Sequence, residues 1–103
     1  MNSIRFSPGV YKDLNPAAKW YRAQGGESLE RRFMDAFKSV LPGIAENPFR
    51  FPVGYRDCRR AQLTSFPYKV YFKPQPGRVL VVLVVHHARD PEFTMRVLKV
   101  RTE

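Results

Sequence analysis

Cationic and hydrogen-bonding side chains alternate with apolar ones along residues 59–73, RRAQLTSFPYKVYFK. Successive side chains of a β-strand point to opposite faces, so this spacing gathers the polar ones on one face of a sheet. They are Arg60, Gln62, Lys69, Tyr71 and Lys73. Because arginine and lysine donate strong hydrogen bonds to phosphates and carboxylates, this face is predicted to meet an anionic partner. Tyr71 is expected to be exposed between lysines, where it could stack on a base or contact a protein.

Two adjacent histidines, His86 and His87, follow a long apolar run and could transfer protons, since an imidazole titrates near neutral pH. Strand alternation puts only one of them on the open face, and the sequence leaves both choices open. The structural alternative is one buried, hydrogen-bonded histidine and one at the rim. Arg59 falls on the inward face. It is therefore expected to fix the structure by pairing with a carboxylate or with carbonyl groups, in preference to touching a substrate.

The charge is distributed unevenly along the 103 residues, whose formal net charge is +9. Residues 1–49 hold 7 Lys/Arg against 5 Asp/Glu, an excess of +2, and residues 50–103 hold 11 against 4, an excess of +7. A basic excess in the sheet-forming half indicates a polyanionic partner, either nucleic acid or an acidic protein. The alternative is a basic protein whose charge serves solubility alone.

Length and composition predict one ordered domain over residues 1–103. The single cysteine, Cys58, excludes an internal disulfide and a cysteine-rich zinc site, and neither a metal nor a cofactor is expected. The N-terminus MNSIRFSPGV lacks the pattern of a signal peptide, and the apolar run Val79–Val85 is too short for a membrane span. The protein is therefore predicted to be cytoplasmic, without a membrane partner.

Apolar periodicity predicts a strand, a helix hairpin and then a sheet. A short strand over Ser3–Phe6 precedes a helix with Ser7 as N-cap, which Gly25-Gly26 closes. A second helix carries one apolar stripe and ends at Asn47-Pro48. The stripe consists of Leu29, Phe33, Phe37, Val40, Leu41 and Ile44.

From Cys58 onward the period changes to two, and RVLVVLVVHH is apolar on both faces, as in a central strand. The expected fold is α+β, with the helix hairpin packed on a mainly antiparallel sheet of three to four strands. The hairpin covers one face of the sheet. The apolar second face of the central strand then predicts a groove, or a seat for a partner's helix.

These features together resemble the RelE/ParE superfamily of toxins from type II toxin-antitoxin systems. The residues that carry the resemblance are WYRAQ at 20–24, RRF at 31–33, IAENP at 44–48 with FRFP, CRRAQLTSFPYKVYF at 58–72 and VLVVHHARDP at 82–91. They extend over nearly the whole chain. The resemblance implies a small, antiparallel-type sheet backed by a helix hairpin.

The resemblance also implies one of two activities. RelE-like members enter the ribosomal A site and cut mRNA with basic residues, whereas ParE-like members inhibit DNA gyrase and are not known as enzymes. Cleavage by the ribose 2′-hydroxyl needs a base, cations for the phosphorane charge and an acid for the leaving oxygen. Against the RelE motifs, Arg60, Lys69 and Arg89 match the positions of the catalytic cations.

The sequence departs from the RelE pattern at two places. Gln62 stands where RelE has lysine, and the tail PEFTMRVLKVRTE lacks the tyrosine or histidine of some ribonuclease members. The interpretation still favours a ribosome-dependent mRNA endoribonuclease. Its predicted catalytic residues are Arg60, Lys69, Arg89, His87 and His86. Its predicted nucleic-acid or partner-binding residues are Gln62, Tyr71, Lys73 and Arg59.

Two alternatives remain beside the ribonuclease. One is a ParE-like, non-enzymatic gyrase inhibitor, which needs only a docking surface. The other is an inactive family member that binds an antitoxin alone. In every case the resemblance implies a cognate antitoxin that forms a hetero-oligomer with the toxin. This antitoxin is expected to be acidic and to fold on binding, because a basic surface with apolar strips suits such a chain.

Overall fold

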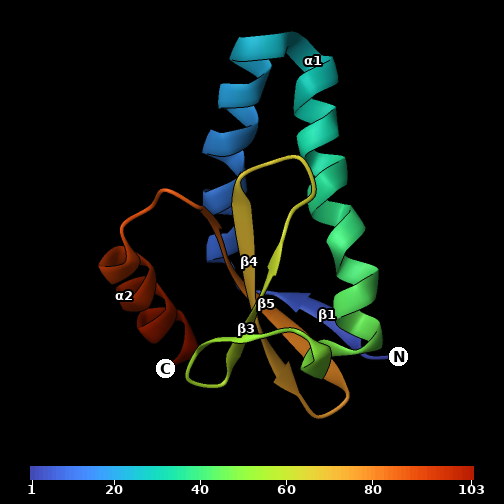
Figure 1. The fold of residues 1–103 in the computed structure, drawn as a ribbon, viewed down its shortest axis with the longest axis vertical. Helices are drawn as coiled ribbons and strands as arrows, with labels where there is room; N and C mark the ends of the chain where they lie inside the picture. Colours follow the sequence, from blue (N-terminus) through green and yellow to red (C-terminus); the bar gives the residue numbers. More distant parts are fainter.

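Helix α1 spans Gly9–Glu46 but folds back on itself at a glycine pair, so that it forms a hairpin of two antiparallel arms (Figure 1). Gly25 (φ −143°, ψ 18°) and Gly26 (φ 75°, ψ −169°) are the only residues in it with non-helical backbone angles. A positive φ is strained for residues with a Cβ, so glycine at position 26 permits the turn. In this computed structural model, which describes residues 1–103, the predicted helix hairpin is confirmed.

The start of α1 differs from the prediction. Ser7 provides no side-chain cap, and its carbonyl oxygen accepts a hydrogen bond from the Val10 N–H at 3.0 Å instead. Pro16 and Pro42 lie inside α1 without non-helical angles, because packing of the buried residues of each arm outweighs the hydrogen bond that each proline removes. The helix ends at Glu46 with Asn47 as its C-cap, in agreement with the predicted stop at Asn47-Pro48. Neither α1 nor any other helix combines the length and apolar character of a membrane span.

The sheet has the order β1-β5-β4-β3-β2, with β1 parallel to β5 and all other neighbours antiparallel. The strands are β1 Ser3–Phe6, β2 Val53–Tyr55, β3 Cys58–Gln62, β4 Tyr68–Gln75 and β5 Arg78–His86. The α+β class and the mainly antiparallel sheet are thus confirmed. The sheet has one strand more than expected, because β2, which follows the 3-10 turn η1 (Pro48–Arg50), is too short to show alternation.

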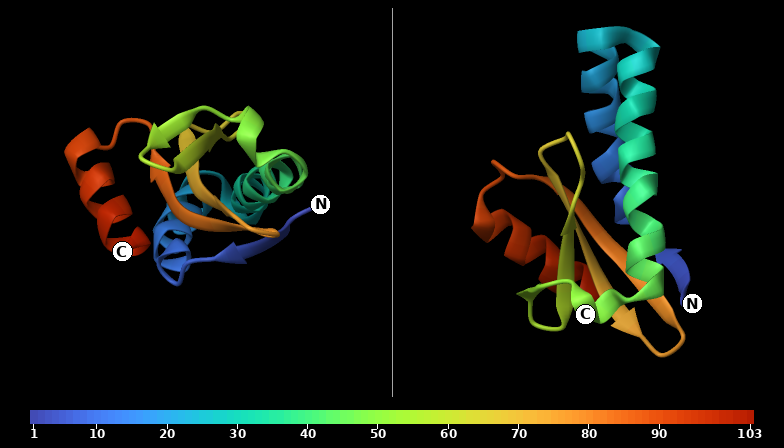
Figure 2. Two further views of the ribbon diagram at one scale, coloured as in Figure 1. Left: turned by 90° about the horizontal axis from the view of Figure 1, so that it is seen from below. Right: turned by 45° about the vertical axis from the view of Figure 1, so that its right-hand side comes forward.

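The α1 hairpin packs on one face of the sheet and buries the larger core, as two further views show (Figure 2). Phe33 of the second arm is fully buried among aromatic rings. Its ring centroid lies 5.0 Å from that of Tyr21, 5.4 Å from that of Phe66 and 5.2 Å from that of Tyr68. This aromatic cluster joins both arms of the hairpin to β4 and to the loop before it.

A second helix, α2 (Pro91–Thr102), covers the opposite face of β5, so that this strand is buried on both sides (Figure 2). Leu98 of α2 is fully buried and clusters with Val82, Leu83 and Val85 of β5. The prediction of an open groove, or of a seat for a partner's helix, is wrong at this place. The chain's own C-terminal helix, which the predicted element order lacks, already fills it.

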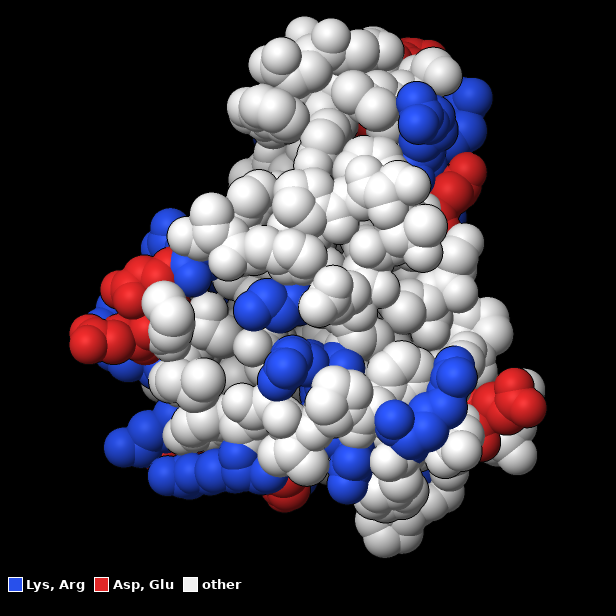
Figure 3. All heavy atoms as spheres, in the orientation of Figure 1, with Lys and Arg blue, Asp and Glu red and all other residues white.

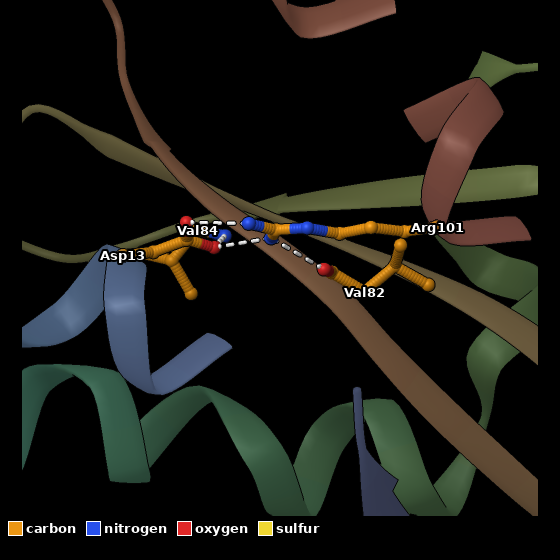
Figure 4. Close-up of polar contacts among 4 residues, drawn as sticks. All are labelled: Asp13, Val82, Val84 and Arg101. Atoms are coloured by element: carbon orange, nitrogen blue, oxygen red, sulfur yellow. Dashed lines mark hydrogen bonds and ion pairs between the residues drawn. The ribbon is translucent and has the colours of Figure 1, made fainter. Parts of the chain in front are cut away.

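One ion pair ties α2 to α1 and to β5 (Figure 4). Arg101 donates to both carboxylate oxygens of Asp13, at 2.7 and 3.0 Å, and to the Val82 carbonyl at 3.0 Å. Asp13 also accepts from the Val84 N–H at 3.0 Å. Because β1 pairs only with the first part of β5, these two side chains bond the backbone groups that lack a strand neighbour. Gly9 is required here, since a Cβ would overlap the Arg101 guanidinium.

Candidate functional site: a basic face of the sheet

The register of β3 and β4 brings three predicted polar residues to one face. Arg60 lies opposite Tyr71, and Gln62 lies opposite Lys69. Residues directly opposite each other in an antiparallel pair point to the same side, which here is the side of α2. Because α2 lies mainly over β5, Arg60, Gln62 and Lys69 remain at least partly exposed. Figure 3 shows Lys and Arg spread over the lower half of this face, with carboxylates mainly toward its margins.

Tyr71 is buried, so the prediction that it is exposed between the lysines is wrong. Its side chain is 4% exposed and clusters with Leu83 of β5 and Leu98 of α2. Gly54 of β2 lies against the ring, where a Cβ would come within 2.6 Å of Cε2. Burial raises the pKa of the Tyr71 hydroxyl, and the nearby Arg60 opposes this in part. Tyr71 therefore supports the basic face from beneath and is not available to stack on a base.

Arg59 points to the other side and holds the segment before β2. Its Nη1 donates to the carbonyl oxygens of Phe49, at 3.1 Å, and Phe51, at 2.7 Å. The guanidinium also lies 5.1 Å from the centre of the Phe49 ring. These contacts engage the arginine within the chain, so that a further contact with a partner would compete with them.

The remaining cations of the face differ in how far they are engaged. Arg60 donates to the Val53 carbonyl at 3.2 Å, which fixes its position beside β2. Lys73 lies 3.4 Å from an oxygen of Asp57, so its charge is partly neutralised. Lys69 forms neither an ion pair nor a side-chain hydrogen bond, which leaves its ammonium free for a partner.

A β-bulge in β5 changes the face of the sheet on which each of the two histidines lies. Tyr71 pairs with Leu83 but Phe72 pairs with Val81, which leaves Val82 as an extra residue on β5. The bulge turns the later residues of β5 over, so His86 lies on the side of α1 and not beside Arg60 and Lys69.

His86 lines an aromatic pocket of 410 Å³ together with Trp20 and Tyr68. Its ring is 5.1 Å from that of Tyr68 in an edge-to-face arrangement. The Nδ1 atom accepts from the Ala88 N–H at 2.9 Å, so the neutral imidazole carries its proton on Nε2. His87 is exposed, and its backbone N–H donates to the Pro67 carbonyl at 2.8 Å. The structure therefore does not bring the two histidines together as a pair.

Arg89 lies in the turn between β5 and α2. Its guanidinium carbon is 3.7 Å from the centre of the Phe93 ring, a cation–π contact that holds it on α2. The face thus brings Arg60 and Lys69 together on neighbouring strands, whereas Arg89 belongs to the rim formed by α2. No group of three or more His, Cys, Asp or Glu side chains is placed to hold a metal ion.

Sequence reasoning missed a second polar site, a groove of 460 Å³ between the second arm of α1 and the loop after β3. Arg32, Arg50, Thr64 and Ser65 line it. No local motif announces it, because its residues come from three separate segments. The pair Arg31-Arg32 reads in the sequence as a solvated helix face.

A family model described as "ParE toxin of type II toxin-antitoxin system, parDE" matches residues 4–91 of the chain. The chain belongs to the ParE toxin family. The matched range contains β1 except for its first residue, all of α1 and the other four strands of the sheet, and with them Arg60, Lys69 and Arg89. No curated protein matches the sequence. The predicted RelE/ParE relationship, and with it the assignment to the toxins of type II toxin-antitoxin systems, is confirmed.

The fold of this ParE-family chain is similar to that of a solved structure described as "Chromosomal ParDE TA system from P. aeruginosa". The TM-score is 0.72 over 84% of this chain and 96% of that chain, at 12% sequence identity. The likeness concerns the fold: a helix hairpin on a mainly antiparallel sheet.

Proposed function

We propose that this ParE-family toxin inhibits growth by binding DNA gyrase and does not itself cleave RNA. The family match supports this, since ParE-like toxins inhibit gyrase. The position of His86 is the observation that carries the choice. It lies on the opposite side of the sheet from Arg60 and Lys69, whereas RNA cleavage needs proton-transfer groups and cations around one phosphate.

A docking surface has looser requirements than a catalytic site. It needs an accessible basic area of fixed shape, and Arg60 and Lys69 supply one over β3 and β4. The buried Tyr71 ring packs beneath this area, and Gly54 of β2 lies against that ring. Electrostatic attraction to an acidic or DNA-bound target then raises the association rate.

A supercoiling assay with purified gyrase tests the proposal. Wild-type protein is expected to block supercoiling, and Arg60→Ala/Lys69→Ala to need about tenfold more protein, a loss of about 1.4 kcal/mol. Arg5→Ala/Lys12→Ala is the matched control, because both side chains are exposed and neither forms an ion pair or a side-chain hydrogen bond. Wild type without effect on gyrase, or equal losses in the two double variants, would contradict the proposal.

The ribonuclease remains a second candidate because Arg60 and Lys69 share a face and His87 is exposed. Primer extension on a reporter mRNA in a reconstituted translation reaction tests it. Cuts in A-site codons that vanish in Arg60→Ala/Arg89→Ala would establish the ribonuclease, and cuts unchanged in His86→Ala/His87→Ala would exclude both histidines from proton transfer. Intact mRNA together with unimpaired supercoiling would indicate an inactive member of the family.

We further propose a cytoplasmic antitoxin partner, acidic and folding on binding, because the chain carries a net charge of +9. An apolar groove of 230 Å³ offers it a seat beside the edge strand β1. Phe6, Tyr11 and Phe37 line this groove, and the first two are exposed. Co-expression with a candidate acidic antitoxin should yield a stable complex that Tyr11→Asp weakens. Trp20→Asp, at a similarly exposed aromatic residue elsewhere on α1, should not weaken it.

A further inference from the structure

The groove between α1 and the β3–β4 loop gathers two cations that form no ion pair within the chain. Arg32 and Arg50 are exposed, and neither side chain forms an ion pair or a hydrogen bond. The Arg50 guanidinium is nevertheless held in place, since it lies 4.7 Å from the centre of the Phe51 ring. It also lies against Gly43 of α1, where a Cβ would come within 2.8 Å of Nη2. The protein thus positions an arginine without giving it a partner.

The opposite wall of the groove is rich in hydrogen-bond donors. Thr64 and Ser65 contribute hydroxyl groups, and neither hydroxyl is engaged in a hydrogen bond. The backbone N–H groups of Thr64, Ser65 and Phe66 donate no hydrogen bond within the chain either. Ser65 has a φ of 67°, a strained angle for a residue with a Cβ. Strain of this kind is concentrated at functional sites, where the surrounding structure imposes it.

The groove suits a phosphate backbone better than an acidic peptide. Only 4 of its 12 lining residues are hydrophobic, whereas 7 of the 8 that line the groove beside β1 are hydrophobic. A peptide that folds on binding needs apolar anchors, which the groove beside β1 provides. One carboxylate, Asp35, also lines the polar groove, and its charge is outweighed by Arg32 and Arg50. The groove has a volume of 460 Å³.

We propose that this groove binds the phosphate groups of duplex DNA, with Arg32 and Arg50 on the phosphate oxygens and the Thr64–Ser65 turn completing the donor set. The choice of DNA rests on the proposed function, because gyrase holds duplex DNA. Gln62, which lies opposite Lys69, also lines the groove, so the groove adjoins the basic face. A toxin docked on gyrase through the basic face could therefore contact the adjoining duplex as well.

Fluorescence anisotropy with a short labelled duplex and no gyrase tests the site. Arg32→Ala/Arg50→Ala is expected to raise the Kd at least about tenfold and to reduce the salt dependence of binding. Each lost phosphate contact lowers the slope of log K against log salt by about 0.9, so the slope should fall by about 2. The matched control is Arg5→Ala/Arg31→Ala, which removes the same charge from exposed, unpaired arginines outside the groove. Equal losses in both variants, or no DNA binding by the wild type, would overturn the proposal.

Charge-conserving substitutions separate the site from general attraction. Arg32→Lys/Arg50→Lys keeps both charges but loses the planar fork of donors. Compared with Arg32→Ala/Arg50→Ala, it should restore the wild-type salt slope but only part of the wild-type affinity for DNA. Thr64→Val/Ser65→Gly removes both hydroxyls and relieves the positive φ, and it should weaken binding several-fold without changing the slope. Full DNA affinity in both of these variants would reduce the groove to a generally basic area and overturn its role as a built site.

Two further probes decide the kind of ligand. Single-stranded RNA of the same length that binds more tightly than the duplex would overturn the DNA assignment, as would a polyglutamate peptide that binds more tightly and depends on Arg32 and Arg50. Because these measurements omit gyrase, the two proposals fail separately. Groove-dependent DNA binding with no effect on supercoiling leaves the site in place and removes the gyrase target.

Discussion

The two faces of the sheet are covered in different ways. The α1 hairpin buries one face under a cluster of 16 buried residues, including the fully enclosed Phe33 and Phe72. The single helix α2 covers part of the other face with a cluster of 5, and Arg101 fastens its last turn. Since apolar burial contributes about 25 cal/mol per Å², most of the stabilisation by apolar burial resides on the first face.

This difference indicates a division of labour. A rigid, aromatic-rich face holds the sheet together, and the other face can then carry exposed cations and a helix attached over a small area. Local stability follows buried contacts, so α2 is expected to exchange amide protons faster than α1 or β4.

The largest expected effect concerns the aromatic core. Phe33→Ala removes a fully buried ring that contacts three others, and it should lower the free energy of unfolding by about 3–5 kcal/mol. Urea denaturation followed by circular dichroism measures this. Phe49→Ala, in a phenylalanine that is 66% exposed, is the control and should cost less than about 1 kcal/mol. Similar losses in the two variants would mean that the hairpin face does not dominate stability.

The next effect concerns the ion pair that fastens α2. Arg101→Ala leaves the Asp13 carboxylate, only 13% exposed, with the Val84 N–H as its one partner. The expected loss is about 3 kcal/mol, at the lower end of the range for breaking a buried pair. Hydrogen exchange by mass spectrometry should show the loss first in α2, because the inner core is untouched.

A matched variant separates the ion pair from local chain effects. Arg96→Ala removes an exposed arginine from the same helix and should leave exchange in α2 almost unchanged. Global unfolding of Arg101→Ala without an earlier opening of α2 would show that the two faces are one cooperative unit.

The hairpin side of the fold could be predicted from sequence because each of its signals is local. The stripe from Leu29 to Ile44, the Gly25-Gly26 stop and the period of two after Cys58 all depend on neighbours in the chain. Helix α2 carried signals that the prediction did not use: Asp90 as N-cap, Pro91 at the first position and Lys99 and Arg101 in the last turn. Its β-branched residues and short length hid the buried pair Thr94 and Leu98, of which only Leu98 is apolar.

The candidate site was less accessible to sequence reasoning, because its geometry depends on tertiary structure. Alternation correctly placed Arg60 and Lys69 on one face. It could not reveal the bulge at Val82, which sends His86 to the other side, or the strand β2, whose Gly54 encloses Tyr71. A register shift and a three-residue strand leave no periodic signal.

A smaller effect tests how β2 supports the basic face. Gly54→Ala would place a Cβ within 2.6 Å of Tyr71 Cε2, and overpacking of this kind costs about 1–3 kcal/mol. The reduced stability in urea should be accompanied by weaker gyrase inhibition, since Arg60 also contacts this strand. Gly77→Ala is unsuitable as a control because Gly77 has a φ of 72°. Lys12→Ala, at an exposed position of α1, should change neither the stability in urea nor the inhibition of gyrase.

The smallest effect distinguishes the two faces by their tyrosines at alkaline pH. Burial raises the pKa of Tyr21 and Tyr68 on the α1 side, and of Tyr71 on the other side, where Arg60 opposes the rise. A hydroxyl whose folded pKa exceeds its unfolded value contributes stability that is complete below pH 10.0, the ordinary tyrosine value, and is lost above it. The free energy of unfolding should therefore decline as the pH rises past 10.0. Tyr21→Phe/Tyr68→Phe should flatten this decline more than Tyr71→Phe does, because it removes two hydroxyl groups and no cation opposes the rise of their pKa values. A larger flattening by Tyr71→Phe would place the more strongly desolvated hydroxyl beneath the basic face.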